Sequence, residues 1–248
     1  MVTPLADGVL LRLARAAPSV GLAALTGSGA VLVLSPHPDD ETLGCGTAIA
    51  AAADAGVRVV VVVLTDGAGS HPGSTAYPPK RLAALRRAEV AEAVERLTRG
   101  TGRVLTLDHP DQGRLSAARR RVYCDRLVRL IDEEGVSALW TTWDGDPHVD
   151  HRRAARLAAE AAARRPAVRL WRFPVWGRFV QCGLRRGERL YSFQSGPYAK
   201  RKRDALAAHR SQMTGLIADD PDGFVMDRAT QRHFLETREM FISNEAHV

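Results

Sequence analysis

The chain has 248 residues, a net charge of +7, 45% hydrophobic residues and 25% charged residues. This length suits one large α/β domain, and the near-average composition excludes a disordered chain. The longest apolar runs, such as residues 59–64, are far too short to cross a bilayer, so we expect no transmembrane segment. Arg12 and Arg15 interrupt the apolar N-terminal stretch that a signal peptide needs, and we therefore expect a cytoplasmic protein.

Residues 7–25 mix apolar and basic side chains at helical spacing, and we expect an N-terminal helix there. Strand-like runs then alternate with helical patterns. The predicted strands are 31–35, 57–64, 104–107, 137–143 and 168–173, and the predicted helices are 41–55, 80–98, 116–134 and 151–165. This alternation predicts an α/β fold with a Rossmann-like, mainly parallel sheet and helices on both faces.

The pattern weakens beyond the fifth predicted strand. We expect loops, a hairpin near residues 189–193 and a helix over about 198–212. No break in composition argues for a second domain. We therefore predict a single domain over residues 1–248, with a core at about 28–175 and a C-terminal extension, 176–248, that completes the pocket.

Most of the positive charge comes from arginine, and one dense basic run stands at residues 200–203. Such a run could attract nucleic acid or a phosphorylated substrate. It stands in a helical pattern without interleaved aromatic residues, which favours an ordinary solvated surface. We therefore do not expect nucleic acid as a partner.

Polar motifs follow the first four predicted strands at the point where each strand ends. In chain order they are residues 37–40, Asp66, Asp111 and residues 148–151. In a sheet of this kind, ligands bind beyond the carboxyl ends of the strands, where the strand order reverses. The sequence therefore predicts one site at this edge of the sheet.

The first and last of these motifs offer the ligands of a divalent metal. His37 and Asp40 stand three residues apart across a turn that enters a helix, so both side chains can reach one point. His151 is the best third ligand. Two imidazoles and one carboxylate leave a fourth position open, which is typical of catalytic Zn²⁺, with Fe²⁺ or another divalent metal as the alternative. The competing interpretation is that Asp39 and Asp40 only cap the helix.

The remaining residues of the two motifs are candidate catalytic groups. Asp39 is free to take a proton from water, since three ligands are already assigned. His148 precedes His151 by three residues, and as an imidazolium it could stabilise an oxyanion or protonate a leaving amine. Asp150 could hydrogen-bond one imidazole and fix its tautomer, or it could be an ordinary N-cap of the helix that follows.

These motifs resemble the PIG-L/LmbE-like family of zinc-dependent N-deacetylases. The resemblance covers about residues 30–160 and rests on PHPDDETLGCG, VLTDG, the Arg86 and Glu89 pair, Pro110-Asp111 and HxDH at residues 148–151, with a looser echo in residues 209–212. It implies an enzyme that removes an N-acetyl or other N-acyl group from an amino sugar or glycoconjugate. Which sugar is the substrate, and whether the chain forms an oligomer, stay open.

The resemblance also implies roles for individual residues. His37, Asp40 and His151 would hold zinc, Asp39 would be the base, and His148 would assist the tetrahedral intermediate.

The implied substrate-binding residues are Arg86 and Asp111, and we add Asp66. Removing Arg86 should then raise KM and leave kcat largely unchanged. Alternatively, Arg86 pairs with Glu89 one turn away and only supports the helix surface. Asp146 stands where some members have a tyrosine that helps to polarise the carbonyl, and its carboxylate would repel an oxyanion.

Three further points stay open at this stage. A Rossmann-type nucleotide- or SAM-binding protein would place Gly44 and Gly46 at a phosphate, although the GxGxxG spacing is missing. A non-catalytic sugar-binding or nucleic-acid-binding member of the same fold is the other alternative. Residues 67–79 form a long loop rich in Gly, Pro and Ser that could line the pocket, and we expect His71 within it to be a surface residue.

Overall fold

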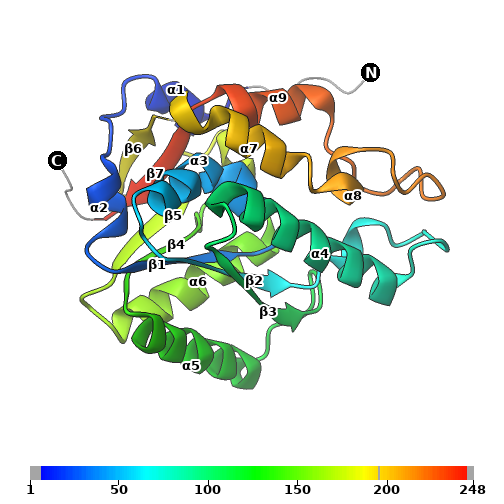
Figure 1. Ribbon diagram of the computed structural model, residues 1–248, viewed down its shortest axis with the longest axis horizontal. Coiled ribbons are helices and arrows are strands. Elements are labelled where there is room, and N and C mark those ends of the chain that lie inside the picture. The colour runs from blue at the N-terminus through cyan, green and yellow to red at the C-terminus, as the bar shows by residue number, and fades with distance from the viewer. Residues whose placement is uncertain (1–6, 195, 245–248) are drawn as a thin grey trace.

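The computed structural model describes residues 7–194 and 196–244, which form one α/β domain around a seven-stranded sheet (Figure 1). The strands are β1 Ala30–Ser35, β2 Val59–Thr65, β3 Arg103–His109, β4 Val136–Thr142, β5 Arg169–Phe173, β6 Arg189–Phe193 and β7 Glu239–Ser243. Their order in the sheet is β3-β2-β1-β4-β5-β7-β6. Strands β1 to β5 are parallel, and β7 and β6 extend the sheet in antiparallel fashion. The predicted fold class is confirmed.

Four long helices connect the parallel strands, and they cover both faces of the sheet (Figure 1). They are α3 Asp40–Asp54, α4 Pro79–Thr98, α5 Ala117–Glu134 and α6 Val149–Ala163. Helices α3 and α4 lie on one face with α7 Ala199–Leu206, and α5 and α6 lie on the other. The shorter helices are α1 Val9–Ala14, α2 Leu22–Thr26, α8 Arg210–Met213 and α9 Arg228–Glu236, with single 3₁₀ turns at Ala68–Ser70, Trp176–Arg178 and Gly196–Tyr198.

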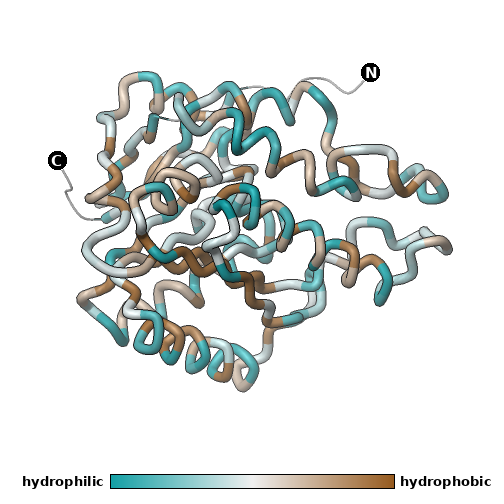
Figure 2. Tube along the Cα trace, viewed as in Figure 1, coloured by the Kyte–Doolittle hydropathy of each residue, from teal (hydrophilic) through white to brown (hydrophobic). Residues whose placement is uncertain are grey.

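The central strands are buried on both faces, which explains their almost continuous apolar sequence. In β1, Val31 and Val33 belong to the core under α3 and α4, whereas Leu32 and Leu34 belong to the core under α5 and α6. Every residue of β2 is buried. Figure 2 shows these strands as the most hydrophobic part of the trace. The two cores hold the sheet rigid, and its carboxyl edge is therefore a firm platform for side chains.

Three local predictions were wrong. The N-terminal segment is not one helix: α1 ends before Pro18, and an extended stretch there exchanges backbone hydrogen bonds with Ser192 before α2 begins. Strand β6 forms no local hairpin and instead pairs with β7, which comes more than 40 residues later. The helix expected over 198–212 breaks between Leu206 and Arg210 into α7 and α8. In each case contacts distant in sequence decide the structure.

The basic run at residues 200–203 is mostly neutralised within the chain. Three of its four side chains reach carboxylates: Lys200 pairs with Asp204 at 2.6 Å, Arg201 with Asp54 at 2.8 Å and Lys202 with Glu239 at 2.8 Å. Arg201 and Lys202 therefore connect α7 to α3 and β7, whereas the Lys200 pair lies within α7 itself. Among residues 7–194 and 196–244, no helix is both long and apolar enough to cross a membrane.

The pair of Lys202 and Glu239 is fully buried and fills a break in α3. Cys45 has non-helical backbone angles, which interrupt the helical hydrogen bonds around it. The backbone N–H groups of Thr47 and Ala48 donate to Glu239 instead, and Lys202 donates to the carbonyl of Leu43. The ion pair thus satisfies backbone groups that the break leaves without partners.

The glycines near this break do not form a phosphate-binding loop. Gly44 lies inside α3, and a Cβ there would come within 2.1 Å of the Phe173 ring. Glycine is therefore needed so that α3 can approach the sheet closely. This finding disfavours the nucleotide-binding alternative.

Candidate metal centre and catalytic site

The predicted residues meet where the strand order reverses. Strand β1 lies between β2 and β4, so the chain leaves β1 and β4 at neighbouring points of the carboxyl edge. Residues 37–40 follow β1 and residues 148–151 open α6 after β4. A cavity of about 600 Å³ opens here, and both motifs contribute to its wall.

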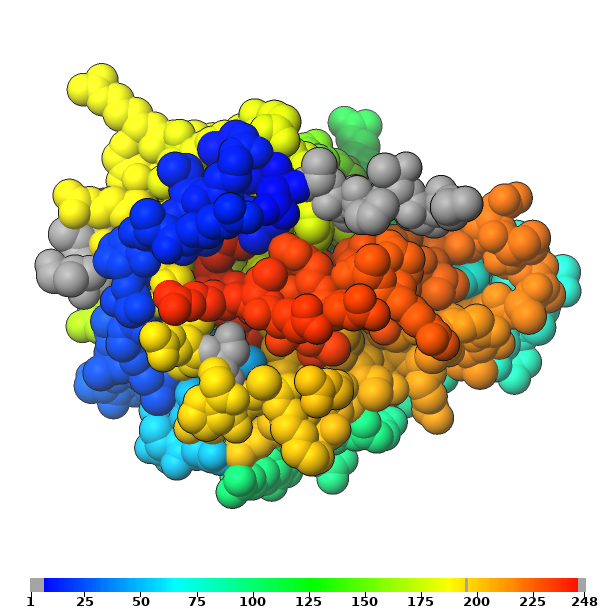
Figure 3. All heavy atoms as spheres, turned by 90° about the horizontal axis from the view of Figure 1, so that it is seen from above, coloured from blue at the N-terminus to red at the C-terminus, as the bar shows by residue number. Residues whose placement is uncertain are grey.

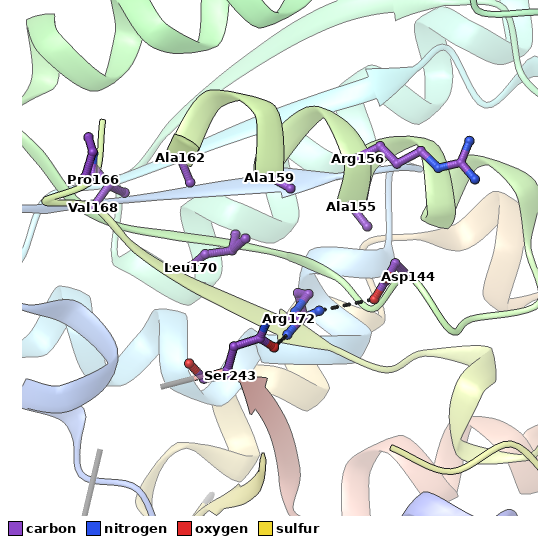
Figure 4. A pocket seen from close by; sticks show the side chains of 11 residues that line it. Asp144, Ala155, Arg156, Ala159, Ala162, Pro166, Val168, Leu170, Arg172 and Ser243 are labelled. Atoms are coloured by element: carbon purple, nitrogen blue, oxygen red, sulfur yellow. Dashed lines mark hydrogen bonds and ion pairs between the residues drawn. The ribbon is translucent and has the colours of Figure 1, made fainter. Parts of the chain in front are cut away.

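A second cavity of about 380 Å³ lies between α6 and β5 (Figure 4). None of the predicted site residues lines it. Arg172, its most buried charged group, already pairs with Asp144 at 3.2 Å and with Glu188 at 3.0 Å. We therefore assign the chemistry to the larger cavity.

The three expected metal ligands lie together. Asp40 Oδ2 is 3.0 Å from Nδ1 of His37 and 3.2 Å from Nε2 of His151. Ligand atoms about 2.0–2.1 Å from one tetrahedral Zn²⁺ ion stand about 3.4 Å apart, so these separations suit a shared ion. All three side chains are almost completely buried.

The outer nitrogen of each imidazole faces a carboxylate. Nε2 of His37 lies 3.3 Å from Asp111 and 3.5 Å from Asp150, and Nδ1 of His151 lies 3.2 Å from Asp146. Metal-binding histidines usually have such a partner, because it fixes the tautomer and raises the basicity of the ligand. Asp111, expected to hold the substrate, therefore lies beside a candidate ligand as well as lining the cavity.

The charges of this cluster favour a cation. Burial alone would raise the pKa of Asp40, but His151 and His37 hold it well below its ordinary value. Burial would lower the pKa of His151, yet Asp40 and Asp146 raise it to about 9. Neither nitrogen of His151 makes a hydrogen bond of good geometry. Buried carboxylates and an unsatisfied imidazole suit a divalent metal ion.

Two groups of donors in the described residues could hold such an ion. His37, His148 and His151 offer ring nitrogens within 4.8 Å of one another, and His37 does the same with Asp111 and Asp150. Both groups share His37. Asp40 belongs to neither group, although its Oδ2 lies close to both His37 and His151.

Asp39 stands at the N-cap position of α3 but makes no capping hydrogen bond. Its carboxylate instead lies 3.2 Å from Nη2 of Arg86. The same Nη2 donates to the carbonyl of Pro38, and Nη1 donates to the carbonyl of Gly67. Burial raises the pKa of Asp39, and Arg86 partly opposes this. Helix capping is thus the wrong explanation of Asp39. Arg86 orients it from the cavity wall.

The proposed pairing of Arg86 with Glu89 is also wrong. Glu89 accepts hydrogen bonds from the backbone N–H and the hydroxyl of Ser211, at 2.9 and 2.6 Å. Glu41, next to the candidate ligands, also has partners of its own. It accepts a hydrogen bond from the backbone N–H of Asp39, and its carboxylate lies 3.3 Å from Nε2 of His209. These contacts explain the weaker match to the family at residues 209–212, because that segment folds back onto the site.

His148 caps α6, a role that we had considered for Asp150. Its Nδ1 accepts the backbone N–H of Asp150 at 3.2 Å, which leaves the hydrogen on Nε2. Burial, together with His37 and His151, lowers the pKa of His148 to about 4. The expected imidazolium is therefore disfavoured. His148 lines the cavity as a neutral hydrogen-bond donor.

Two further expectations need correction. Asp66 does not line the cavity, because its Oδ1 accepts the backbone N–H groups of Ala68 and Asp111 and so joins two loops. His71 is not a surface residue: it is only 2% exposed. Its ring packs so closely on Gly223 that a Cβ there would lie 2.1 Å away.

Sequence reasoning missed two parts of the site. Asp146 accepts backbone N–H groups of Val175 and Gly177 and turns its other oxygen to His151, so it faces away from the reacting position. The far wall of the cavity comes from Trp176, Gln212 and residues 222–226. The sequence predicted only that the extension at residues 176–248 completes the pocket, and the weaker match to the family at residues 209–212 was the one local signal for this wall.

The far wall is anchored to the loop at residues 67–79. Asp219 accepts hydrogen bonds from Ser74, Thr75 and Ala76, and Asp220 accepts one from the backbone of Gly73. Figure 3 shows the orange C-terminal segment beside this cyan loop. The two segments therefore form one continuous wall.

Comparisons with known proteins agree with this picture. The family model for PIG-L, described as GlcNAc-PI de-N-acetylase, matches residues 32–162, just over half of the chain. A diacetylchitobiose deacetylase from Thermococcus kodakarensis is 32% identical over 139 residues, which are 54% of this chain and 49% of that protein. The chain thus spans about half the length of the curated relative that it matches.

Solved structures share the fold. The N,N'-diacetylchitobiose deacetylase from Pyrococcus horikoshii has a TM-score of 0.64 at 22% identity, over 86% of this chain and 80% of that one. The conserved protein TT1542 from Thermus thermophilus has a TM-score of 0.60 at 26% identity, over 86% and 93%. A shared fold alone does not identify the reaction, which must be inferred from the residues of the site.

Proposed function

Because the chain belongs to the PIG-L family, we propose that it is a metal-dependent hydrolase that removes an N-acetyl or other N-acyl group from an amino sugar or glycoconjugate. The observation that carries this proposal is the contact of Asp40 with both His37 and His151, at 3.0 and 3.2 Å, beside the second buried carboxylate of Asp39. The 32% identical relative is a diacetylchitobiose deacetylase, which supports this proposal.

We assign His37, Asp40 and His151 as ligands of Zn²⁺. When bound, the ion supplies Lewis acidity, which polarises the amide carbonyl and lowers the pKa of a water molecule to about 7. Asp111 and Asp150 hold the outer nitrogen of His37, and Asp146 holds that of His151. Arrangements of this kind keep both rings in the correct tautomer.

The residues of the chain then move the protons. Asp39 takes a proton from the attacking water while the new C–O bond forms and the carbonyl electrons move onto oxygen. His148 stabilises that oxygen with a hydrogen bond from its Nε2–H and keeps its own proton. When the C–N bond breaks, the proton on Asp39 passes to the leaving nitrogen, which departs as a free amine. The carboxylic acid that remains still carries the second proton of the water, and it becomes a carboxylate by releasing this proton to solvent. Arg86 keeps Asp39 oriented throughout.

The other cavity residues are assigned to the sugar. Gln212 and Asp111 line the cavity and offer polar atoms to its hydroxyl groups, so the extension at residues 176–248 completes the pocket of a single domain. The partner is a small amino-sugar substrate. A cytoplasmic location stays a prediction.

The direct test is metal analysis combined with a screen of N-acetylated sugars for release of acetate and primary amine. We expect about one zinc-type ion per chain. We also expect hydrolysis that is lost on chelation and restored by the metal. A protein that binds the metal at full occupancy but releases neither product from any substrate would make this a non-catalytic member of the fold.

A further inference from the structure

Exposed apolar side chains stand at the mouth of the large cavity. In the described residues, the exposed large hydrophobic side chains are Leu13, Val122, Leu216, Phe224 and Val225. Two of these, Phe224 and Val225, are neighbours in the cavity wall and are 39% and 40% exposed. The partly exposed Trp176 stands beside Phe224, with ring centroids 5.9 Å apart and an interplanar angle of 90°.

This apolar surface is held in place by the backbone. The N–H of Phe224 donates to the carbonyl of Ser70 at 2.7 Å, and that of Met226 donates to Gln212 at 2.8 Å. The hydrogen bonds of Asp219 to the facing loop fix the same segment a few residues earlier. A contiguous apolar surface that is already ordered before binding loses little entropy when a ligand covers it. It is therefore suited to recognition.

The cavity is polar at one end and apolar at the other. Its inner end holds Asp39, Asp40 and Arg86, all nearly buried, where the reacting amide must lie. The apolar residues near this end, Leu43 and Met226, are only 1% and 3% exposed and leave little surface for a long acyl chain. The part of the substrate that reaches the mouth is thus the part furthest from the amide.

We propose that Trp176, Phe224 and Val225 form an aglycone subsite, so that the preferred substrate is an N-acetylated amino sugar with an alkyl or aromatic aglycone. This inference rests on the proposed function and adds the class of substrate. Aromatic and aliphatic side chains supply the contacts, and covering them removes apolar area from water.

The test compares two substrates that share the same reacting amide: the methyl and the n-octyl β-glycosides of N-acetylglucosamine, both below the micelle concentration of the octyl compound. We expect kcat/KM to be at least about 10-fold higher for the octyl glycoside, the scale of discrimination in an apolar pocket. Phe224→Ala and Val225→Ala should move this ratio toward one. Leu216→Ala is the matched control, since Leu216 is 40% exposed in the same segment but does not line the cavity.

A binding measurement separates this inference from the proposed function. Trp140, Trp143 and Trp171 are fully buried, so a change of tryptophan fluorescence on adding the octyl glycoside reports on Trp176. Tight octyl binding without hydrolysis would support the subsite and overturn the proposed function. Equal affinity and equal kcat/KM for both glycosides would overturn the subsite alone. A preference for N-octanoylglucosamine methyl glycoside over its N-acetyl form would show that the apolar wall takes the acyl chain, and it too would overturn the aglycone subsite.

Discussion

The two halves of the cavity wall are built in different ways. The inner half comes from short motifs at the ends of β1 and β4, where each side chain projects from a rigid strand end into a buried cluster. The outer half comes from Trp176 and residues 222–226, which lie on connecting segments fixed by hydrogen bonds to another loop. The groups proposed to act on the reacting amide thus lie at strand ends, and the groups proposed to select the substrate lie on hydrogen-bonded loops.

The largest effect should come from His151. Replacing it by alanine removes an imidazole that contacts Asp40, so metal content and hydrolysis should fall together to background. Metal analysis after dialysis measures the first and amine release the second. Asp111→Asn should be measured beside it. If Asp111→Asn loses the metal while His151→Ala keeps it at full occupancy, the ion lies between His37, Asp111 and Asp150.

Asp39→Asn should separate chemistry from metal binding. The change removes the proposed base but keeps its shape, so kcat should drop by about 10²- to 10⁴-fold, the usual contribution of a general base. Metal content should stay at the wild-type level. If the variant loses its metal instead, Asp39 is a ligand and the inner half holds its base elsewhere.

Asp146→Ala tests the support of a candidate ligand. Removing the carboxylate beside Nδ1 of His151 should weaken metal affinity by about 10- to 100-fold, as is typical for the partner of a metal-bound histidine. A competition titration with a chelator measures the change. If the metal affinity is unaltered, Asp146 acts only as the hydrogen-bond acceptor of the backbone N–H groups of Val175 and Gly177.

For Arg86 the structure changes the expectation. The sequence suggested a pure effect on KM, but the guanidinium contacts the carboxylate of Asp39, so Arg86→Ala should lower kcat by about 10-fold through loss of orientation. The kinetic control is Arg87→Ala on the same helix, since Arg87 pairs with Asp108 in a largely exposed salt bridge. A raised KM with unchanged kcat would instead show that Arg86 binds the substrate, as the sequence suggested.

The smallest effect concerns the outer half. Hydrogen bonds from Ala76 and Ser74 lower the pKa of Asp219 to about 2, below the unfolded value of about 3.9. The anchoring of the wall is therefore complete above the unfolded pKa and is lost as the pH falls through about 2. The protection of the Thr75 and Ala76 amides from hydrogen exchange, relative to their intrinsic rates, should fall over this range. Asp219→Ala should lack this protection at every pH, whereas Asp222→Asn, a change in the same segment, should follow the wild type.

The inner half was largely predictable and the outer half was not. The apolar runs of β1 and β4 and the motifs after them are local signals, and the reversal of strand order brings them together. The role of Asp146 depends on a turn that points it back at His151, which no local pattern encodes. Phe224 and Val225 belong to a loop whose position is decided by Asp219 and by residues 73–76, far away in the sequence.

The buried pair of Lys202 and Glu239 links the candidate metal centre to the order in which the chain is made. Glu239 is the first residue of β7, and it completes the hydrogen bonds at the break of α3, the helix that begins with Asp40. During synthesis, α3 and Asp40 emerge nearly 200 residues before this partner does. Until β7 docks, Glu239 cannot accept the backbone N–H groups of Thr47 and Ala48, so we expect α3 and the turn before it to reach their final geometry only after β7 has joined the sheet.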